Sequence, residues 1–243
     1  RRVVVLGSTG AIGRSTLAVI RKTGGLEVAG LACRSDERTL RRQISEFSPR
    51  YVWFGGDCRN LRSAFPSVKF LSGPQGLVDL AIADGADTVV AAIPGIGSLQ
   101  AVLAALEAGR TVGLATKEIL VVAGALVMET ARRHGASILP VDSEHNAVFQ
   151  LLRHEGTAHL TRIILTASGG PFFGRDTLSD VTVQQALEHP VWKMGRKITV
   201  DSATLMNKAL EMIEAHYLFD LPVEKIDLVV HPQSIVHSLV EFA

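Results

Sequence analysis

The chain has 243 residues, 47% of them apolar and 20% charged, and 25 basic against 24 acidic side chains give a formal net charge of +1. This composition is typical of a folded globular protein and excludes disorder as the main state. The charge balance lacks the basic excess of a nucleic-acid binder, and no apolar run approaches the ~20 residues that cross a bilayer. We therefore expect neither nucleic acid nor membrane as a partner.

Two further features concern the ends of the chain. It starts with Arg1 in place of methionine, shows no signal-peptide pattern, and stops within an apolar, strand-like stretch. We interpret it as part of a longer protein that has no targeting segment in the residues present.

Short β-branched runs alternate with helical patterns through the first part of the sequence. Strands are predicted over residues 3–6, 26–32, 51–54, 69–71, 88–92, 111–114 and 137–141, and helices over 12–21, 37–47, 99–108 and 120–133. Such alternation is typical of a parallel sheet with helices on both faces. The sequence thus predicts a Rossmann-like, doubly wound α/β domain over residues 1–141.

The pattern changes after residue 141. Strand-like runs at 162–166 and 227–230 are separated by long polar segments, and residues 168–195 carry the glycines and prolines of a mobile loop. A helix is predicted over 203–219, with Asp201 or Ser202 as its N-cap. We expect a second, α+β domain over 142–243, which continues beyond the last residue present.

A glycine-rich turn follows the first predicted strand and opens the first helix. Its sequence, GSTGAIG at residues 7–13, has the spacing G-x-x-G-x-x-G. Glycines at such a turn let backbone N–H groups and the helix N-terminus approach a pyrophosphate. The motif indicates a dinucleotide site, with a tight strand-to-helix turn that binds nothing as the alternative.

The end of the second strand bears on which dinucleotide would bind. NAD sites usually place an acid there, whereas NADP sites prefer a cation for the 2′-phosphate. Here Arg34 and Ser35 follow the strand and no acid stands at its tip, which favours NADP(H); a solvated surface arginine is the alternative. Residues 92–97, with two glycines, would bring another loop over the same sheet edge, or form a simple turn.

Two acids stand where a strand ends and a helix starts. Asp142 and Glu144 are two residues apart, so on extended backbone their carboxylates point to one side. A divalent cation between them would relieve their repulsion, and hard oxygen ligands favour Mg²⁺ or Mn²⁺. Two solvated acids at a helix N-terminus are an equally good interpretation of the spacing.

The later helix offers another acid beside polar groups. Asn207 and Lys208 precede Glu211 by four and three residues, so Glu211 shares a helix face with both. The set suits an anionic substrate beside a metal ion. By itself, a Lys208–Glu211 surface pair is the simpler interpretation.

A series of longer motifs runs through the whole chain in one order. They are GSTGAIG (7–13), ATKE (115–118), LPVDSEHN (139–146), SGGPF (168–172), HPVW (189–192), MGRK (194–197), VDSAT (200–204), MNKALE (206–211), HPQS (231–234) and VHS (236–238). In this order they closely resemble the 1-deoxy-D-xylulose 5-phosphate reductoisomerase family. The resemblance implies an NADPH- and divalent-metal-dependent enzyme that rearranges and reduces that phosphosugar to 2-C-methyl-D-erythritol 4-phosphate, in the non-mevalonate isoprenoid pathway.

The resemblance also assigns roles residue by residue. The metal ligands it implies are Asp142, Glu144 and Glu211, where Mg²⁺ or Mn²⁺ would bind, and the catalytic set is Lys117, Glu144 and His189. The substrate-binding set is Ser143, Ser168, Trp192, Ser202, Asn207, Lys208 and Glu211, with His189 and Trp192 on a flap. The cofactor set is Thr9, Gly10, Ala11, Ile12, Arg34, Ser35, Thr116, Glu118 and Gly195.

Some positions depart from the family pattern. Thr116 replaces an asparagine, Ile119 a serine, Val191 an asparagine and Lys193 a serine. They motivate a second hypothesis, a non-catalytic paralogue that binds dinucleotide as a regulatory module. A semialdehyde dehydrogenase is excluded, because it would need a nucleophilic cysteine in the second domain and both cysteines lie in the first.

The resemblance has three consequences for the protein as a whole. It implies a homodimer formed through the sheet of the second domain. It implies a bacterial cytoplasmic protein or, in a eukaryote, one of the plastid stroma. It also implies a C-terminal helical domain beyond the residues present.

Overall fold

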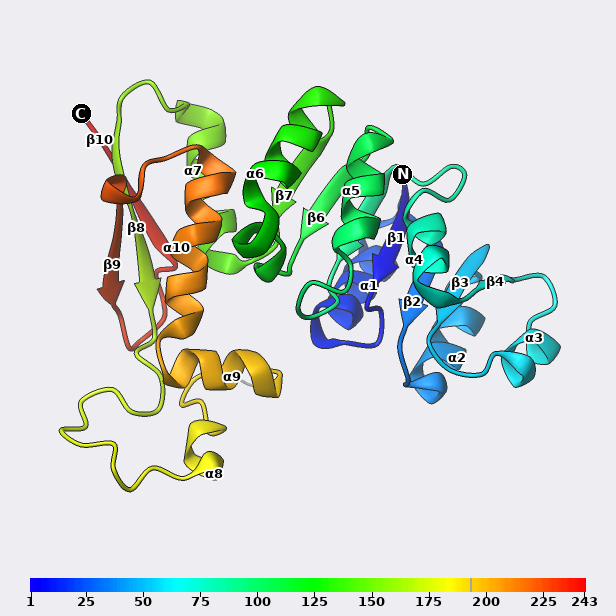
Figure 1. Ribbon diagram of the computed structural model, residues 1–243, viewed down its shortest axis with the longest axis horizontal. Coiled ribbons are helices and arrows are strands. Elements are labelled where there is room, and N and C mark those ends of the chain that lie inside the picture. The colour runs from blue at the N-terminus through cyan, green and yellow to red at the C-terminus, as the bar shows by residue number, and fades with distance from the viewer. Residues whose placement is uncertain (193) are drawn as a thin grey trace. The chain divides into compact units, whose positions relative to one another are not determined.

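The computed structural model describes residues 1–192 and 194–243, which form two compact units, Arg1–Leu139 and Pro140–Ala243 (Figure 1). Each unit has its own sheet and its own apolar core. Within the described residues, no helix is both long enough and apolar enough to cross a membrane.

Unit 1 is built on a seven-stranded sheet of order β4-β3-β2-β1-β5-β6-β7. Its strands are β1 (Arg2–Leu6), β2 (Glu27–Cys33), β3 (Tyr51–Phe54), β4 (Lys69–Leu71), β5 (Thr88–Ala91), β6 (Thr111–Leu114) and β7 (Ser137–Pro140). Neighbouring strands from β4 to β6 in this order pair in parallel. The predicted Rossmann-like parallel fold is confirmed.

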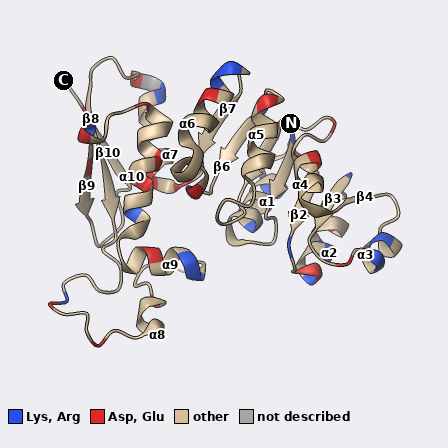
Figure 2. Cartoon of the chain, in the orientation of Figure 1, with Lys and Arg blue, Asp and Glu red and all other residues tan. Residues whose placement is uncertain are grey.

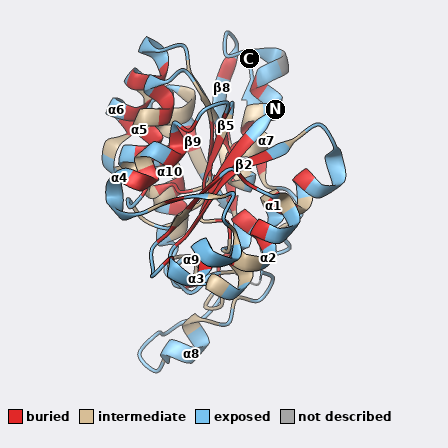
Figure 3. Ribbon diagram, turned by 90° about the vertical axis from the view of Figure 1, so that its right-hand side faces the viewer, coloured by how far each residue is buried: buried red, intermediate tan, exposed pale blue. Residues whose placement is uncertain are grey.

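Helices cover both faces of this sheet (Figure 1). They are α1 (Ala11–Thr23), α2 (Glu37–Phe47), α3 (Arg59–Ala64), α4 (Gly73–Ala81), α5 (Leu99–Glu107) and α6 (Glu118–Arg133). On one face, Leu17 and Ile20 of α1 and Leu40 and Ile44 of α2 join the core beneath Val5. Figure 3 shows the buried residues concentrated on the strands and on the helix sides that face them.

The strand order of unit 1 reverses between β1 and β5. The chain runs outward in one direction from β1 through β2 to β4, and in the other direction from β5 through β6 to β7. At such a switch point the loops that follow the two central strands part, leaving a crevice at the carboxyl edge of the sheet where nucleotides bind. The glycine-rich turn follows β1, so the topology places it at this point.

Unit 2 packs helices on a three-stranded sheet of order β10-β8-β9. Its elements are α7 (Ser143–Glu155), β8 (Leu160–Ala167), α8 (Val183–Ala186), α9 (Arg196–Ala203), α10 (Met206–Phe219), a 3₁₀ turn (Val223–Lys225), β9 (Ile226–Val230) and β10 (Ser238–Phe242). β10 is antiparallel and β9 parallel to β8. Val148 of α7 and Ala215 of α10 pack against Ile163 and Leu165 of β8, which fixes both helices on the sheet.

The predicted helix over 203–219 is wrong at its start. The chain forms α9 up to Ala203, and α10 begins only at Met206. Leu205 between them has φ +59°, a left-handed conformation that cannot continue a right-handed helix. Asp201 and Ser202 therefore lie inside α9 and do not cap α10. The helices α3, α4, α8 and α9 were not predicted either; α3, with 6 residues, and α8, with 4, have too few turns for a clear apolar period.

Candidate functional site

The glycine-rich turn of unit 1 is packed so closely that side chains are excluded from two of its positions. Gly7 has φ +89°, and a Cβ placed there would lie 2.6 Å from the carbonyl oxygen of Ala92. A Cβ on Gly13 would lie 2.3 Å from the carbonyl oxygen of Gly7. The close approach at Gly7 brings the β1 turn against the start of the loop after β5, and the close approach at Gly13 packs the first turn of α1 on the β1 turn itself.

The outer side of the same turn is open. Gly10 is the N-cap of α1 and carries no side chain to cover the first N–H groups of the helix. Gly10, Ala11 and Ile12 are exposed, while Thr9 is turned inward with its hydroxyl 3.3 Å from Cys33 Sγ. An uncapped, exposed helix N-terminus offers donors and positive dipole potential to an anion. The turn therefore suits a pyrophosphate.

A buried polar pair fixes the turn from below. The hydroxyl of Ser8 donates to Gln43 Oε1 at 2.8 Å, and Gln43 Nε2 donates to the carbonyl oxygen of Ser8 at 2.9 Å. Both side chains are buried. Gln43 was not among the residues predicted from the sequence, although a glutamine on the apolar face of α2, next to Ile44, is a signal that could have indicated it.

The residues that follow β2 carry positive charge, and the acid nearby is already used to cap a helix. Arg34 and Ser35 are exposed directly after the strand. The nearby Asp36 is the N-cap of α2 and accepts from the backbone N–H of Thr39 at 3.0 Å, a hydrogen bond that lowers the pKa of Asp36. Because this acid serves the helix, the arrangement matches an anionic group at the strand end better than a ribose hydroxyl.

The start of α6 holds three residues predicted to act at the site. The buried hydroxyl of Thr116 donates to the carbonyl oxygens of Ala91 and Ile93, at 3.3 and 3.0 Å, so it supports the loop after β5. Lys117, also buried, is the N-cap of α6, and Glu118 is its first residue. Ile119 is wholly buried, so its departure from the family pattern serves the core of unit 1.

Unit 2 contains a cavity of about 300 Å³ at the carboxyl end of β8. Its lining includes every candidate residue of this unit except Gly195, the N-cap of α9. These lining candidates are Asp142, Ser143, Glu144, Ser168, His189, Trp192, Ser202, Asn207, Lys208 and Glu211. The fold thus brings residues from five separate segments to one hollow.

The three acids of this cavity lie in or near the first turns of two helices. Asp142 is the N-cap of α7 and Glu144 lies in its first turn, so the extended backbone assumed for this pair is wrong. Glu211 comes from α10 and lies in the second turn of that helix. Ser238 of β10 donates to the carbonyl oxygen of Glu144 at 2.9 Å, which ties the α7 start to the sheet.

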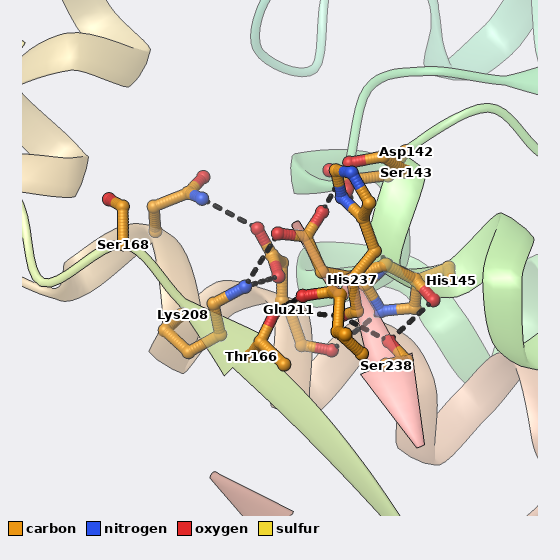
Figure 4. Close-up of polar contacts among 12 residues, drawn as sticks. Asp142, Ser143, His145, Thr166, Ser168, Lys208, Glu211, His237 and Ser238 are labelled. Carbon is orange, nitrogen blue, oxygen red and sulfur yellow. Dashed lines mark hydrogen bonds and ion pairs between the residues drawn. The ribbon is translucent and has the colours of Figure 1, made fainter. Parts of the chain in front are cut away.

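Polar neighbours hold the carboxylates of Glu144 and Glu211, and Figure 4 shows Lys208 directed toward Glu211. Lys208 Nζ lies 3.1 Å from Glu144 Oε1 and also contacts Glu211 Oε2. Asn207 Nδ2 donates to Glu211 Oε1 at 2.5 Å, and Ser143 Oγ donates to Glu144 Oε2 at 2.6 Å. Glu211 thus shares a face with Asn207 and Lys208, as expected, but the Lys208–Glu211 pair is buried and is not a surface pair.

The electrostatics of the cavity favour a bound cation. Burial raises the pKa of Glu144, and the charges of Glu211 and Asp142 raise it further, while the Lys208 ammonium and the Ser143 hydroxyl act in the opposite direction. Two carboxylates that disfavour each other's ionisation in a shielded place are stabilised by positive charge. One lysine supplies part of that charge here.

A buried histidine and a further glutamate lie behind the acids and were missed by the sequence analysis. His145 Nε2 is 2.9 Å from the carbonyl oxygen of Glu211, and Nδ1 is 3.9 Å from Asp142 Oδ1 and 3.7 Å from Glu214 Oε2. Burial lowers the pKa of His145, but these carboxylates outweigh it and raise the pKa to about 9. The spacings Asp142 to His145 and Glu211 to Glu214, each i to i+3, were the available signal.

The donor set fits a hard divalent cation. One ligand atom each from Asp142, His145 and Glu211 lies within 4.8 Å of the others. His145 directs one ring nitrogen to a backbone carbonyl and the other to two carboxylates. Its role is therefore to hold the acids in position more than to serve as a metal ligand in place of one of them. Carboxylate oxygens from Asp142, Glu144 and Glu211 are the ligands that Mg²⁺ and Mn²⁺ prefer.

Segment 189–192 forms a turn held by its own histidine. The backbone N–H groups of Val191 and Trp192 donate to His189 Nδ1 at 3.1 and 2.9 Å, so the proton of the neutral ring is on Nε2, 2.9 Å from Ser168 Oγ. The Trp192 ring is exposed, 6.3 Å from the His237 ring between centroids. Lys193 lies outside the described residues.

The loop after β8 brings two serines to the cavity. Gly170 has φ +70°, and a Cβ there would lie 2.6 Å from the carbonyl oxygen of Ser202. Ser168 Oγ faces His189 Nε2 and accepts from the Gly170 N–H at 3.3 Å, so its own proton can be donated to a ligand. The close packing of this loop on α9 therefore places Ser168 and Ser202 beside the same ligand space.

These features define a Rossmann-like α/β unit with a nucleotide-type turn, followed by an α+β unit with a carboxylate-lined cavity. Sequence models of 1-deoxy-D-xylulose 5-phosphate reductoisomerase and of its C-terminal domain match residues 3–124 and 138–219. The chain belongs to the 1-deoxy-D-xylulose 5-phosphate reductoisomerase family, which confirms the resemblance seen in the sequence.

Individual relatives agree with this membership. The chain is 48% identical to the reductoisomerase of Thermodesulfovibrio yellowstonii and 50% identical to that of Paraburkholderia xenovorans. Each alignment covers 100% of this chain, but only 65% and 63% of the respective relative. The chain thus spans somewhat less than two thirds of these relatives.

Solved structures of the family share the fold. A reductoisomerase in complex with NADPH, fosmidomycin and magnesium matches with a TM-score of 0.92 at 42% identity, over 100% of this chain and 64% of that one. The Zymomonas mobilis enzyme in complex with NADPH matches with a TM-score of 0.89 at 43% identity, over 100% of this chain and 64% of that one.

Proposed function

We propose that this chain carries the NADPH-dependent rearrangement and reduction of 1-deoxy-D-xylulose 5-phosphate to 2-C-methyl-D-erythritol 4-phosphate, in the non-mevalonate isoprenoid pathway. The observation that carries the proposal is the cavity of unit 2, where three carboxylates lie beside hydroxyl, amide and ammonium donors. Family membership supplies the substrate. The chemistry of the lining residues supplies the reason that a phosphosugar and a cation would bind together.

The phosphate end of the substrate would be bound by the donors of α9, α10 and the loop after β8. Ser168, Ser202, Asn207 and Lys208 all line the cavity. A phosphate dianion accepts from hydroxyl, amide and ammonium groups, and an ammonium donor gives the stronger, charge-assisted bond. Trp192 would cover the substrate, and His189 would hold the turn that carries this indole.

The reacting end would lie at the acids. Asp142, Glu144 and Glu211 would hold Mg²⁺ or Mn²⁺, which when bound polarises carbonyl and hydroxyl oxygens as a Lewis acid. Ser143, on the first turn of α7, would contact the substrate backbone. Lys117 would stabilise oxyanion charge with its ammonium group.

Unit 1 would bind NADPH, the source of the hydride. The turn at Thr9, Gly10, Ala11 and Ile12 would hold the pyrophosphate, and Arg34 with Ser35 the 2′-phosphate. Thr116, Glu118 and Gly195 would contact the nicotinamide half. Of these, Thr116 already donates its hydroxyl to backbone carbonyls, so its contribution would come through the loop it supports.

The test follows the consumption of NADPH by absorbance, with 1-deoxy-D-xylulose 5-phosphate and Mn²⁺ present. We expect turnover by the parent chain and a loss of about 10²-fold or more in Glu144→Gln, which removes a charge at the acids. Glu155→Gln, an exposed glutamate at the end of the same helix, is the matched control and should retain activity. Silence of the parent, also after extension to the relatives' full length, would favour a non-catalytic dinucleotide-binding module.

We also propose a homodimer formed through the sheet of unit 2. β9 is an edge strand, and the consecutive residues Leu228, Val229 and Val230 are exposed on it, alternating between the two faces of the sheet. An exposed apolar edge is a site for pairing with another chain. The expected compartment is the bacterial cytoplasm or the plastid stroma, in agreement with the two buried free cysteines Cys33 and Cys58.

A further inference from the structure

The donors assigned to the substrate are engaged with the acids assigned to the metal (Figure 4). Lys208 bridges Glu144 and Glu211, Asn207 donates to Glu211, and Ser143 donates to Glu144. In this arrangement the donors and the acids of the cavity are already partners of one another. A substrate phosphate and a metal ion would each have to compete for groups that are already bonded to one another.

Lys208 is the central group of this competition. Its side chain is only 7% exposed, so its ammonium group has lost most of its hydration and depends on the two carboxylates for counter-charge. Glu211 is 1% exposed and depends on the ammonium group in return. A divalent cation that takes the same carboxylate oxygens would repel the ammonium group and remove its partners. The two cations therefore exclude each other at Glu144 and Glu211.

A displaced ammonium group needs a new anion, and the cavity has room for one. Ser168 and Ser202 line the same hollow as Lys208, and the Ser168 hydroxyl can donate into it. A phosphate group accepted there would draw Lys208 away from the acids. Binding of phosphate and binding of the metal ion would both break the contacts of Lys208 with Glu144 and Glu211.

We propose that Lys208 is a tethered cation that couples metal binding to phosphate binding: it neutralises Glu144 and Glu211 when the metal is absent, and moves to the phosphate when the metal binds. This inference rests on the proposed function of the cavity. Because coupling between two ligands is reciprocal, phosphate should tighten metal binding by the same factor by which metal tightens phosphate binding. Lys208 is then a positioning residue for the metal as well as a ligand for the anion.

The test measures Mn²⁺ binding directly, by the electron paramagnetic resonance signal of free Mn²⁺, with and without inorganic phosphate. Because burial and the neighbouring acids raise the pKa of Glu144, all measurements are made at one pH above neutral, which limits competition by protons. Three chains are compared: the parent, Lys208→Met, and Lys197→Met. Lys197 pairs with Asp201 on α9 and does not line the cavity, so its removal controls for a general loss of positive charge.

The proposal predicts two results for Lys208→Met. Without phosphate, it should bind Mn²⁺ about tenfold more tightly than the parent, because a competing cation is gone. Phosphate should tighten Mn²⁺ binding about tenfold in the parent and in Lys197→Met, and less than about twofold in Lys208→Met. Equal or weaker Mn²⁺ binding by Lys208→Met without phosphate, or an undiminished phosphate effect, would overturn the proposal.

The outcomes separate this inference from the proposed function. If the parent binds no Mn²⁺, the metal site itself is wrong and both fall. If the parent binds Mn²⁺ but Lys208→Met behaves like the parent, only the coupling role of Lys208 fails. Circular dichroism checks that the variant folds; if it does not, the parent alone still decides, because absence of any phosphate effect on its Mn²⁺ affinity overturns the coupling.

Discussion

The buried pair of Ser8 and Gln43 gives a sharp prediction about the glycine-rich turn. In Gln43→Leu the side chain keeps nearly its size but loses both polar atoms. The Ser8 hydroxyl loses its acceptor at 2.8 Å, and the Ser8 carbonyl oxygen loses its donor at 2.9 Å. Both groups stay buried, since Ser8 is 0% exposed and the new side chain excludes water from the same place.

The magnitude follows from these two groups. A buried polar group left without a partner costs about 1–3 kcal/mol, and the apolar leucine offsets part of the loss, so we expect about 2–4 kcal/mol of destabilisation. For a chain of this size the melting temperature should fall by about 5–10 °C. The double variant with Ser8→Ala removes the stranded hydroxyl, so it should recover about 1 kcal/mol relative to Gln43→Leu.

The assay is thermal and urea denaturation followed by circular dichroism, with NADPH fluorescence as a second readout. We expect weaker NADPH binding in Gln43→Leu, because the turn loses its support. The matched control is Gln75→Leu, where an exposed glutamine of α4 bonds only to Asp79 on its own helix. A destabilisation of Gln43→Leu below about 0.5 kcal/mol, the range of ordinary surface substitutions, would refute the reasoning.

Three further predictions concern unit 2. Gly170→Ala should cost about 2–3 kcal/mol in urea denaturation, because its φ is +70°; an unchanged midpoint would contradict this. With chelator present, protonated His145 should stabilise the fold by on the order of 3 kcal/mol at any pH below its unfolded pKa of 6.5, and this stabilisation should be lost as the pH rises through about 9. In urea titrations, His145→Gln should lack this dependence of stability on pH. Burial lowers the pKa of His189, so the neutral ring holds the 189–192 turn above the ordinary pKa of histidine, and this turn is lost as the pH falls below the lowered pKa. Trp192 emission, measured in a Trp53→Phe background, should therefore change only on acidification.

Local signals explain what was predicted correctly about the fold. The strands Tyr51–Phe54, Lys69–Leu71 and Thr111–Leu114 and the helix Glu37–Phe47 have the predicted bounds. Each is a short apolar run or an apolar period of 3.6 flanked by turn residues, so its conformation is favoured by its own sequence. The α9–α10 break was not predicted, because the left-handed Leu205 is a residue type that rarely adopts that conformation.

The spacing of charged residues along the chain says less about their partners than their distance in space; Figure 2 shows charges of both signs on α10. Lys208 and Glu211 have the spacing of an ordinary surface pair, yet both are buried. The difference arises because Glu144 of α7, more than sixty residues earlier, faces them across the cavity at 3.1 Å from the lysine. The spacing alone could not show that third partner.

From the sequence alone, the Rossmann-like sheet, the family and ten of the residues that line the cavity were predicted, because they depend on local pattern and on motifs in order. The folded chain adds the pairings that the sequence did not reveal: Gln43 with Ser8, His145 with Glu214, and Lys208 with Glu144. Each of these three pairings joins side chains that are far apart in the sequence. Their energies depend on burial and distance, which exist only once the chain has folded.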